Sequence, residues 1–249
     1  MNKYITAIFF IVFSSQVMTA SETPSELAKY VAYTNISDQA SLQRGAKYFV
    51  NYCLGCHSLE HASYERTGRD IGLTNDLVEK NLIFTQNKIT DKIISSMDQQ
   101  EAEQWLLAKP PDLTLVARAR GADWVYSYLM TFYKDENRPT GVNNWRYPNT
   151  AMPHVLLPLQ GMQAANFVNN TDEDGITRKE IQSLSLIQDG SLTRQEYAIA
   201  VQDITNFLSY TAEPMQLERK SIGFWVLLFF IIFGLLGYFL KREFWKDLH

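Results

Sequence analysis

The chain of 249 residues is poor in cysteine and has little imbalance of charge. It contains only two cysteines, both in one short motif, so no further pair remains to cross-link distant segments and stability must come from a buried core. The formal net charge is −4, which argues against nucleic acid as a partner and allows a basic protein partner. The length and a hydrophobic content of 46% fit one globular domain plus attachments.

The two cysteines belong to the segment Cys53-Leu54-Gly55-Cys56-His57. Cys-x-x-Cys-His is the pattern that attaches a c-type haem, in which each thiol bonds a vinyl group and the histidine ligates the iron. Residues three apart on a helix share one face, about 5–6 Å apart at Cβ, so both sulfurs can reach one edge of a porphyrin. The motif predicts one covalently bound haem c, with Cys53 and Cys56 as attachment points and His57 as a metal ligand.

Two other kinds of site compete with haem attachment. A thiol–disulfide switch also uses Cys-x-x-Cys, but the flanking sequence has no strand–helix–strand pattern of the thioredoxin kind. A zinc site could combine both cysteines with His57 and His61, but the adjacent Cys56 and His57 would crowd one tetrahedron. We therefore prefer the haem interpretation and expect His61 to be a solvated surface histidine.

The first twenty residues resemble an export signal. Residues 1–20 carry Lys3 and then an apolar run, and they end in small residues at Ala20. This pattern is typical of a secretory signal peptide cleaved near Ala20, and an uncleaved anchor is the alternative. One lysine and no arginine argue against a mitochondrial presequence and favour bacterial export. We therefore expect residues 21–221 to form a periplasmic c-type cytochrome domain.

Close to the C-terminus, residues 222–240 contain no charged side chain. A run of this length can span the hydrocarbon core of a bilayer, and a buried core helix is the less favoured alternative. Since the preceding domain is expected to be exported, residues 241–249 become a cytoplasmic tail. The sequence thus predicts a single transmembrane helix in the bacterial inner membrane, with lipid around it and the haem domain outside.

Apolar periodicity predicts helices between these two ends. One helix begins at Ser41, a possible N-cap, and carries the cysteine motif at its end, with a loop after the motif. A second covers residues 98–107. A third follows the capping box Thr193–Glu196 and ends near Pro214.

The segment 111–129 predicts a helix, a break at Gly121 and another helix, with Pro111 in the first turn. Arg118 and Arg120 then lie in the last turn of the first helix, where cations are favoured by the helix dipole. The alternative role for both is pairing with haem propionates, which suits the forked guanidinium. The residues alone leave both roles open.

A long irregular region, residues 137–163, is rich in proline and glycine, and loops of this length are usually functional. Within it Met152 precedes Pro153, and a thioether is a common sixth ligand in electron-transfer cytochromes. Core filler is the alternative role of Met152. His154 places a second imidazole close by.

In four blocks, the sequence resembles the cytochrome c1 family, the haem-carrying subunits of quinol–cytochrome c reductase (the cytochrome bc1 complex). The tail block is specific to this family, whereas the haem motif is shared by many cytochromes. The blocks are Arg44-Gly45-Ala46 leading to Cys53–His57, Pro110-Pro111-Asp112-Leu113 through Arg120, Ala151-Met152-Pro153, and Ala212-Glu213-Pro214 with Glu218–Phe224.

The resemblance implies a mainly α-helical, class I-like c-type cytochrome domain on one C-terminal membrane helix. It implies His57 and Met152 as axial ligands, Arg120 near a propionate and Pro111 packed beside the haem. The chain departs from the family at Trp124, where relatives commonly have a tyrosine, so an indole N–H replaces a phenol. A second departure is that His154 follows Pro153 where the family usually has further prolines.

The function implied is electron transfer without bond chemistry. Family members pass one electron from the Rieske iron–sulfur protein to a cytochrome c, within a complex that contains cytochrome b and that we expect to be dimeric. Two other functions remain open: a stand-alone, membrane-anchored periplasmic cytochrome, and a haem peroxidase or gas sensor with a displaceable sixth ligand.

Overall fold

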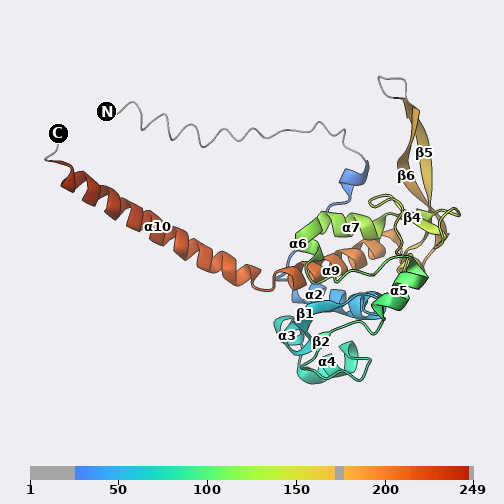
Figure 1. The fold of residues 1–249 in the computed structure, drawn as a ribbon, viewed down its shortest axis with the longest axis horizontal. Coiled ribbons are helices and arrows are strands. Elements are labelled where there is room, and N and C mark those ends of the chain that lie inside the picture. The colour runs from blue at the N-terminus through green and yellow to red at the C-terminus, as the bar shows by residue number, and fades with distance from the viewer. Residues whose placement is uncertain (1–25, 172–176, 247–249) are drawn as a thin grey trace.

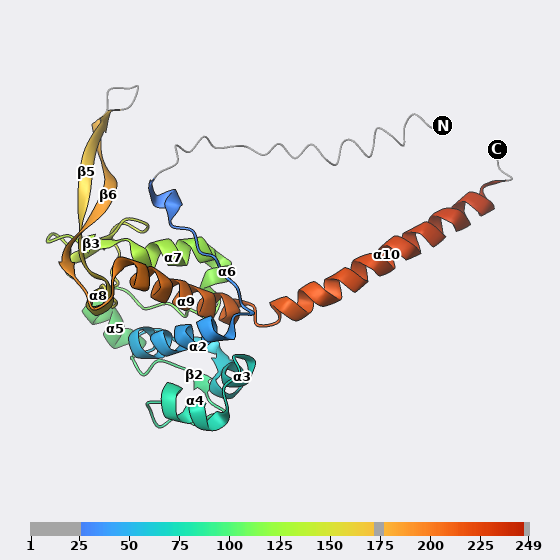
Figure 2. The same cartoon turned by 180° about the vertical axis from the view of Figure 1, so that it is seen from behind.

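The computed structural model describes residues 26–171 and 177–246 (Figure 1). The predicted leader, residues 1–20, lies outside the described residues. The described part starts with a short 3-10 helix, η1 (Glu26–Lys29). Figures 1 and 2 show helices α2, α7 and α9 gathered at the centre, with helix α10 and a long hairpin projecting from them. The expectation of a mainly helical domain with one long apolar C-terminal helix is confirmed.

The central packing is a crossing of two helices, α2 (Gln39–Tyr48) and α9 (Arg194–Ala212). Gly45 allows the close approach, because a Cβ there would lie 2.1 Å from the carbonyl oxygen of Asp203 and 2.7 Å from Cβ of Phe207. No side chain fits at that distance without moving a backbone. The crossing brings together helices from the two ends of the domain sequence.

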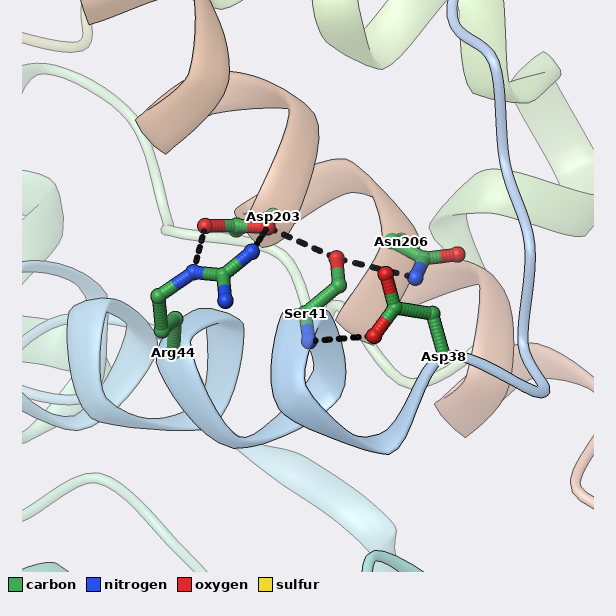
Figure 3. Close-up of polar contacts among 5 residues, drawn as sticks. All are labelled: Asp38, Ser41, Arg44, Asp203 and Asn206. Atoms are coloured by element: carbon green, nitrogen blue, oxygen red, sulfur yellow. Dashed lines mark hydrogen bonds and ion pairs between the residues drawn. The ribbon is translucent and has the colours of Figure 1, made fainter. Parts of the chain in front are cut away.

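A buried polar network reinforces this crossing (Figure 3). Asp203 of α9 accepts hydrogen bonds from Ser41 Oγ at 2.7 Å and from Arg44 Nε at 2.6 Å. Asn206 Nδ2 donates to Ser41 Oγ at 3.1 Å. The predicted N-cap at Ser41 is wrong: Asp38 caps α2 by accepting from the Ser41 amide at 3.0 Å, and the Ser41 hydroxyl is used by the other helix.

The loop predicted after the cysteine motif is replaced by regular structure. Strand β1 (Leu59–Ser63) pairs with the distant β2 (Lys92–Ile93), and between them lie α3 (Tyr64–Asp70) and α4 (Asn75–Leu82). The prediction missed this region because its strand pairing joins segments far apart in sequence. His61 is exposed, as expected.

The middle helices are largely where periodicity placed them. Helix α5 (Gln99–Leu106) confirms the second predicted helix. Helices α6 (Val116–Arg120) and α7 (Ala122–Met130) are separated at Gly121, whose φ of 93° is a left-handed conformation that favours glycine. The predicted start at Pro111 is wrong, since the chain stays irregular there and docks against the cysteine motif.

A long antiparallel hairpin of β5 (Gly161–Thr171) and β6 (Thr177–Asp189) was not predicted. It projects from the domain in Figures 1 and 2. Its base contacts β3 (Phe132–Lys134), which pairs with β4 (Val142–Asn144). Apart from β4 and the short α8 (Leu157–Gln160), most of the predicted irregular region is irregular.

The C-terminal helices confirm two predictions. The capping box of Thr193 and Glu196 is formed, and α9 ends two residues before Pro214. Helix α10 (Gln216–Phe244) is long and apolar enough to cross a membrane, and none of its residues is buried. It extends beyond the predicted span 222–240 at both ends.

Candidate functional site

The cysteine motif forms a compact turn at the end of α2. The helix continues through the π-helical turn η2 (Phe49–Cys53), and the amides of Cys56 and His57 then both donate to the Cys53 carbonyl oxygen, at 3.0 and 2.9 Å. Cys53 is buried, Cys56 is partly buried, and both are free thiols. The motif therefore lies at a helix end, as predicted, and its fold is set by its own backbone.

His57 is buried and oriented by a backbone partner. Its Nδ1 lies 2.7 Å from the carbonyl oxygen of Pro111. A carbonyl can only accept, so Nδ1 carries the proton and Nε2 keeps its lone pair. Burial lowers the pKa of His57 and keeps the imidazole neutral near pH 7. A neutral imidazole with one nitrogen fixed by a carbonyl is the usual arrangement of a histidine metal ligand.

The double-proline segment docks along the motif through further hydrogen bonds. The Leu113 amide donates to the Ser58 carbonyl oxygen at 2.9 Å, and the Glu60 amide donates to Asp112 Oδ2 at 2.8 Å. These contacts hold the segment in an irregular conformation, which explains why the helix predicted from Pro111 begins only at Val116.

The alternatives to haem attachment fit poorly. Burial raises the pKa of Cys53 to about 12 and also raises that of Cys56, so neither is the acidic thiol that a redox switch needs. Among the described residues no group of three or more His, Cys, Asp or Glu side chains could hold a metal ion, and His61 is exposed. Two free thiols beside an imidazole of fixed tautomer fit a haem c.

The two predicted arginines have different neighbours. The guanidinium carbon of Arg120 lies 5.2 Å from the centroid of the Trp124 ring, within cation–π range. Arg118 acts on Glu213, whose pKa is lowered mainly by a hydrogen bond from Arg219 and slightly by the charge of Arg118. Both lie in the last turn of α6, so the helix-dipole role applies to both, and only Arg120 has the aromatic partner.

Met152 is partly buried against the hydrophobic core to which Cys53 belongs. Its amide donates to Thr150 Oγ1 at 3.4 Å. His154 is buried, with its ring stacked on Phe132 at a centroid distance of 4.8 Å and an interplanar angle of 4°. Burial lowers the pKa of His154 to about 4, so it is neutral. Within the described part of the chain no hydrogen bond joins this loop to the motif, and the two share only the core.

Sequence reasoning missed Tyr128 and the polar network of Figure 3. The Tyr128 hydroxyl lies 2.7 Å from Thr150 Oγ1, and its ring stacks on Trp124 at 5.1 Å and 6°. The four-residue spacing of Trp124 and Tyr128 on a helix could have suggested the stack. The partners of Asp203 lie some 160 residues away, and no local pattern indicates them.

The structure and the comparison with known proteins indicate the same class of protein. The helix crossing, the cysteine motif with its fixed histidine and the single apolar C-terminal helix define a c-type cytochrome with a candidate membrane span. The model of the Cytochrome C1 family matches residues 31–248. The chain belongs to the cytochrome c1 family.

Three similar proteins illustrate the range of this similarity. Cytochrome c1 of Allochromatium vinosum is 46% identical over 249 residues, which covers the whole of both chains. The ammonia monooxygenase gamma subunit of Nitrosomonas europaea is 43% identical over 215 residues, 86% of each chain. Cytochrome c1-1, heme protein, mitochondrial, of Solanum tuberosum is 26% identical over 235 residues, 87% of this chain and 67% of its own.

Proposed function

We propose that this chain is the haem-carrying electron-transfer subunit of a cytochrome bc1 complex. The observation that carries the proposal is His57, kept neutral by burial and oriented by the Pro111 carbonyl beside two free thiols, in a member of the cytochrome c1 family. A bound haem c supplies one-electron redox chemistry, and the chain itself makes and breaks no substrate bond.

Four side chains hold the haem in this proposal. Cys53 and Cys56 would hold the haem through thioether bonds, and Nε2 of His57 and the sulfur of Met152 would ligate its iron. The Pro111 carbonyl supports the histidine, because a second partner that fixes the ring orientation also raises the basicity of the ligating nitrogen. One haem is bound per chain.

Four residues act on the haem periphery in this proposal. Arg120 would pair with a propionate, and Trp124, whose ring lies under the Arg120 guanidinium carbon at 5.2 Å, would keep that group in place and offer an indole N–H. Arg118 contributes positive charge at the same helix end, where Glu213 competes with the haem propionates for that charge. Pro111 packs beside the ring. A buried propionate without a cation would carry an uncompensated charge.

We place the chain in the bacterial inner membrane. Residues 1–20 are the export signal, residues 21–221 the periplasmic haem domain, residues 222–240 the membrane anchor and residues 241–249 the cytoplasmic tail. The subunit takes one electron from the Rieske iron–sulfur protein and gives it to a cytochrome c. It assembles with cytochrome b and lipid in a dimeric complex.

The relative named ammonia monooxygenase gamma subunit favours a second candidate, a haem subunit of a different membrane oxidoreductase. Purification of the full chain from native membranes in mild detergent separates the two. We expect cytochrome b and a Rieske protein to co-purify with it. Co-purification of a monooxygenase instead would favour the second candidate, and purification alone would favour a stand-alone cytochrome.

A further inference from the structure

The loop that carries Met152 is anchored on both sides by buried side chains. Thr150, two residues before it, is 3% exposed, and His154, two residues after it, is 7% exposed. Asn149 precedes Thr150 with a φ of 63°, and Nη2 of Arg138 donates to the Asn149 carbonyl oxygen at 3.0 Å. The backbone of Met152 is therefore confined by contacts outside its own loop.

The anchor before Met152 is a hydrogen bond between two hydroxyl groups. Tyr128 Oη lies 2.7 Å from Thr150 Oγ1, and the same Thr150 oxygen accepts the amide of Met152 at 3.4 Å. One hydroxyl thus links the phenol to the ligand's own backbone. Burial raises the pKa of Tyr128 to about 12, so the phenol keeps its proton and can donate it.

Tyr128 is itself fixed by aromatic neighbours. Its ring stacks on Trp124 at 5.1 Å and meets Phe132 edge-on at 5.2 Å and 70°. Phe132 in turn stacks on His154. The tyrosine therefore contacts both the residue that supports Arg120 and the residue that holds the far side of the loop. A tyrosine ring packed in this way has few rotamers available, so its hydroxyl is held in a fixed position.

We propose that Tyr128 is a positioning residue for the sixth ligand: its hydroxyl, through Thr150, holds the Met152 loop in place and limits dissociation of the sulfur from the iron. The proposal rests on the proposed function, in which Met152 ligates the haem. It assigns the stiffness of the loop to a side-chain contact from α7. In this chain Pro153 is followed by His154 and not by a further proline that would stiffen the loop.

The test measures how readily an external ligand replaces Met152 in the ferric holoprotein. Imidazole is added to the purified full chain in detergent, and the loss of the far-red sulfur-to-iron band is followed in time. Tyr128→Phe keeps the ring stack and removes only the hydroxyl. We expect imidazole binding to become about three- to tenfold faster, the range that the net loss of one hydrogen bond supports.

Variants at Thr150 separate the hydroxyl from the branched shape of the side chain. Thr150→Val keeps the shape and loses the hydroxyl, so we expect an acceleration at least as large as in Tyr128→Phe, because the Met152 amide loses its acceptor as well. Thr150→Ser keeps the hydroxyl and should behave like the wild type. Because the Tyr128 hydroxyl acts through Thr150, the double variant Tyr128→Phe/Thr150→Val should be no faster than Thr150→Val alone.

Tyr126→Phe is the matched control, since Tyr126 is a half-buried tyrosine on the same helix and makes no hydrogen bond to the described residues. We expect it to leave the rate unchanged. An unchanged rate in Tyr128→Phe, or a fast Thr150→Ser beside a slow Thr150→Val, overturns the proposal while Met152 ligation stands. If the wild type itself lacks the far-red band, Met152 ligation fails and the proposal fails with it.

Discussion

The motif turn and the methionine loop are stabilised in opposite ways. The turn from Cys53 to His57 closes through backbone hydrogen bonds among its own residues, and its outside partners include Pro111 and the Ser95 hydroxyl, which donates to the Gly55 carbonyl oxygen at 2.9 Å. The methionine loop has a weak contact of its own, from the Met152 amide to Thr150 Oγ1 at 3.4 Å, and its anchors from elsewhere include Arg138 and side chains of α7 and β3. The motif turn is held by contacts local in sequence, whereas the methionine loop depends on tertiary packing. Substitutions in the two regions should therefore affect different properties of the protein.

The largest effect is expected in the motif turn. We expect Cys53→Ser or Cys56→Ser to leave most chains without haem, because each removes one of the two covalent attachment points. Haem retained after acid–acetone extraction, or staining in a denaturing gel, measures the loss. Normal covalent haem in both variants would contradict the attachment site.

Met152→Leu tests the other region without breaking covalent attachment. Since a thioether raises the potential of the iron, we expect the reduction potential to fall by on the order of 0.1 V or more, with loss of the far-red band and of quinol oxidation. Redox titration of the purified protein measures the shift. A far-red band that persists in Met152→Leu would exclude Met152 as the ligand.

His154→Ala is the companion variant of this test. The structure places the ring of His154 in a stack on Phe132, so the variant should destabilise the fold by about 2–4 kcal/mol through an empty buried site. The band and the potential should stay nearly unchanged. A wild type that lacks the band, together with a changed potential in His154→Ala, would assign the sixth position to His154.

Gly45→Ala should weaken both regions together, because α2 carries the motif and crosses α9. The added Cβ would lie 2.1 Å from the Asp203 carbonyl oxygen, so the helices must separate, at a cost of about 1–3 kcal/mol or more. Thermal unfolding of the holoprotein measures it. Gly223→Ala in α10 is the control, since no heavy atom lies within 4 Å of a Cβ there. Equal stability of the two variants would contradict a stabilising role for the close approach of α2 and α9.

Features that depend on local sequence were predictable, and features that depend on tertiary packing were not. The cysteine motif, the capping box of α9, the glycine break and the apolar tail are signals carried by neighbouring residues, and all appear in the structure where periodicity and spacing placed them. The residues suggested Met152 as a sixth ligand, and the resemblance to a family favoured that role over core filler. It could not indicate Tyr128, whose contact with Thr150 joins positions 22 residues apart.

The errors have one physical cause. Ser41 looks like an N-cap, but its hydroxyl bonds to Asp203 of another helix. Pro111 suits a helix start, but its carbonyl accepts from His57. The β5–β6 hairpin is defined by the antiparallel pairing of its two strands, and neither strand shows this pairing in its own sequence. In each case a tertiary partner overrides the local preference.

The smallest expected effect separates the two arginines at the junction between the regions. Arg120→Gln removes the cation over Trp124 together with the proposed partner of a propionate, whereas Arg118→Gln removes a charge that acts only weakly on Glu213. The cation–π contact alone contributes about 0.5–1 kcal/mol at an exposed site, and a propionate left without its cation adds to that loss. We therefore expect Arg120→Gln to lower the unfolding midpoint of the holoprotein and its reduction potential more than Arg118→Gln. Thermal melts and redox titrations of both variants in the same buffer measure the difference. If both changes are equal and negligible, neither arginine meets a propionate and the helix dipole is the only role left to them.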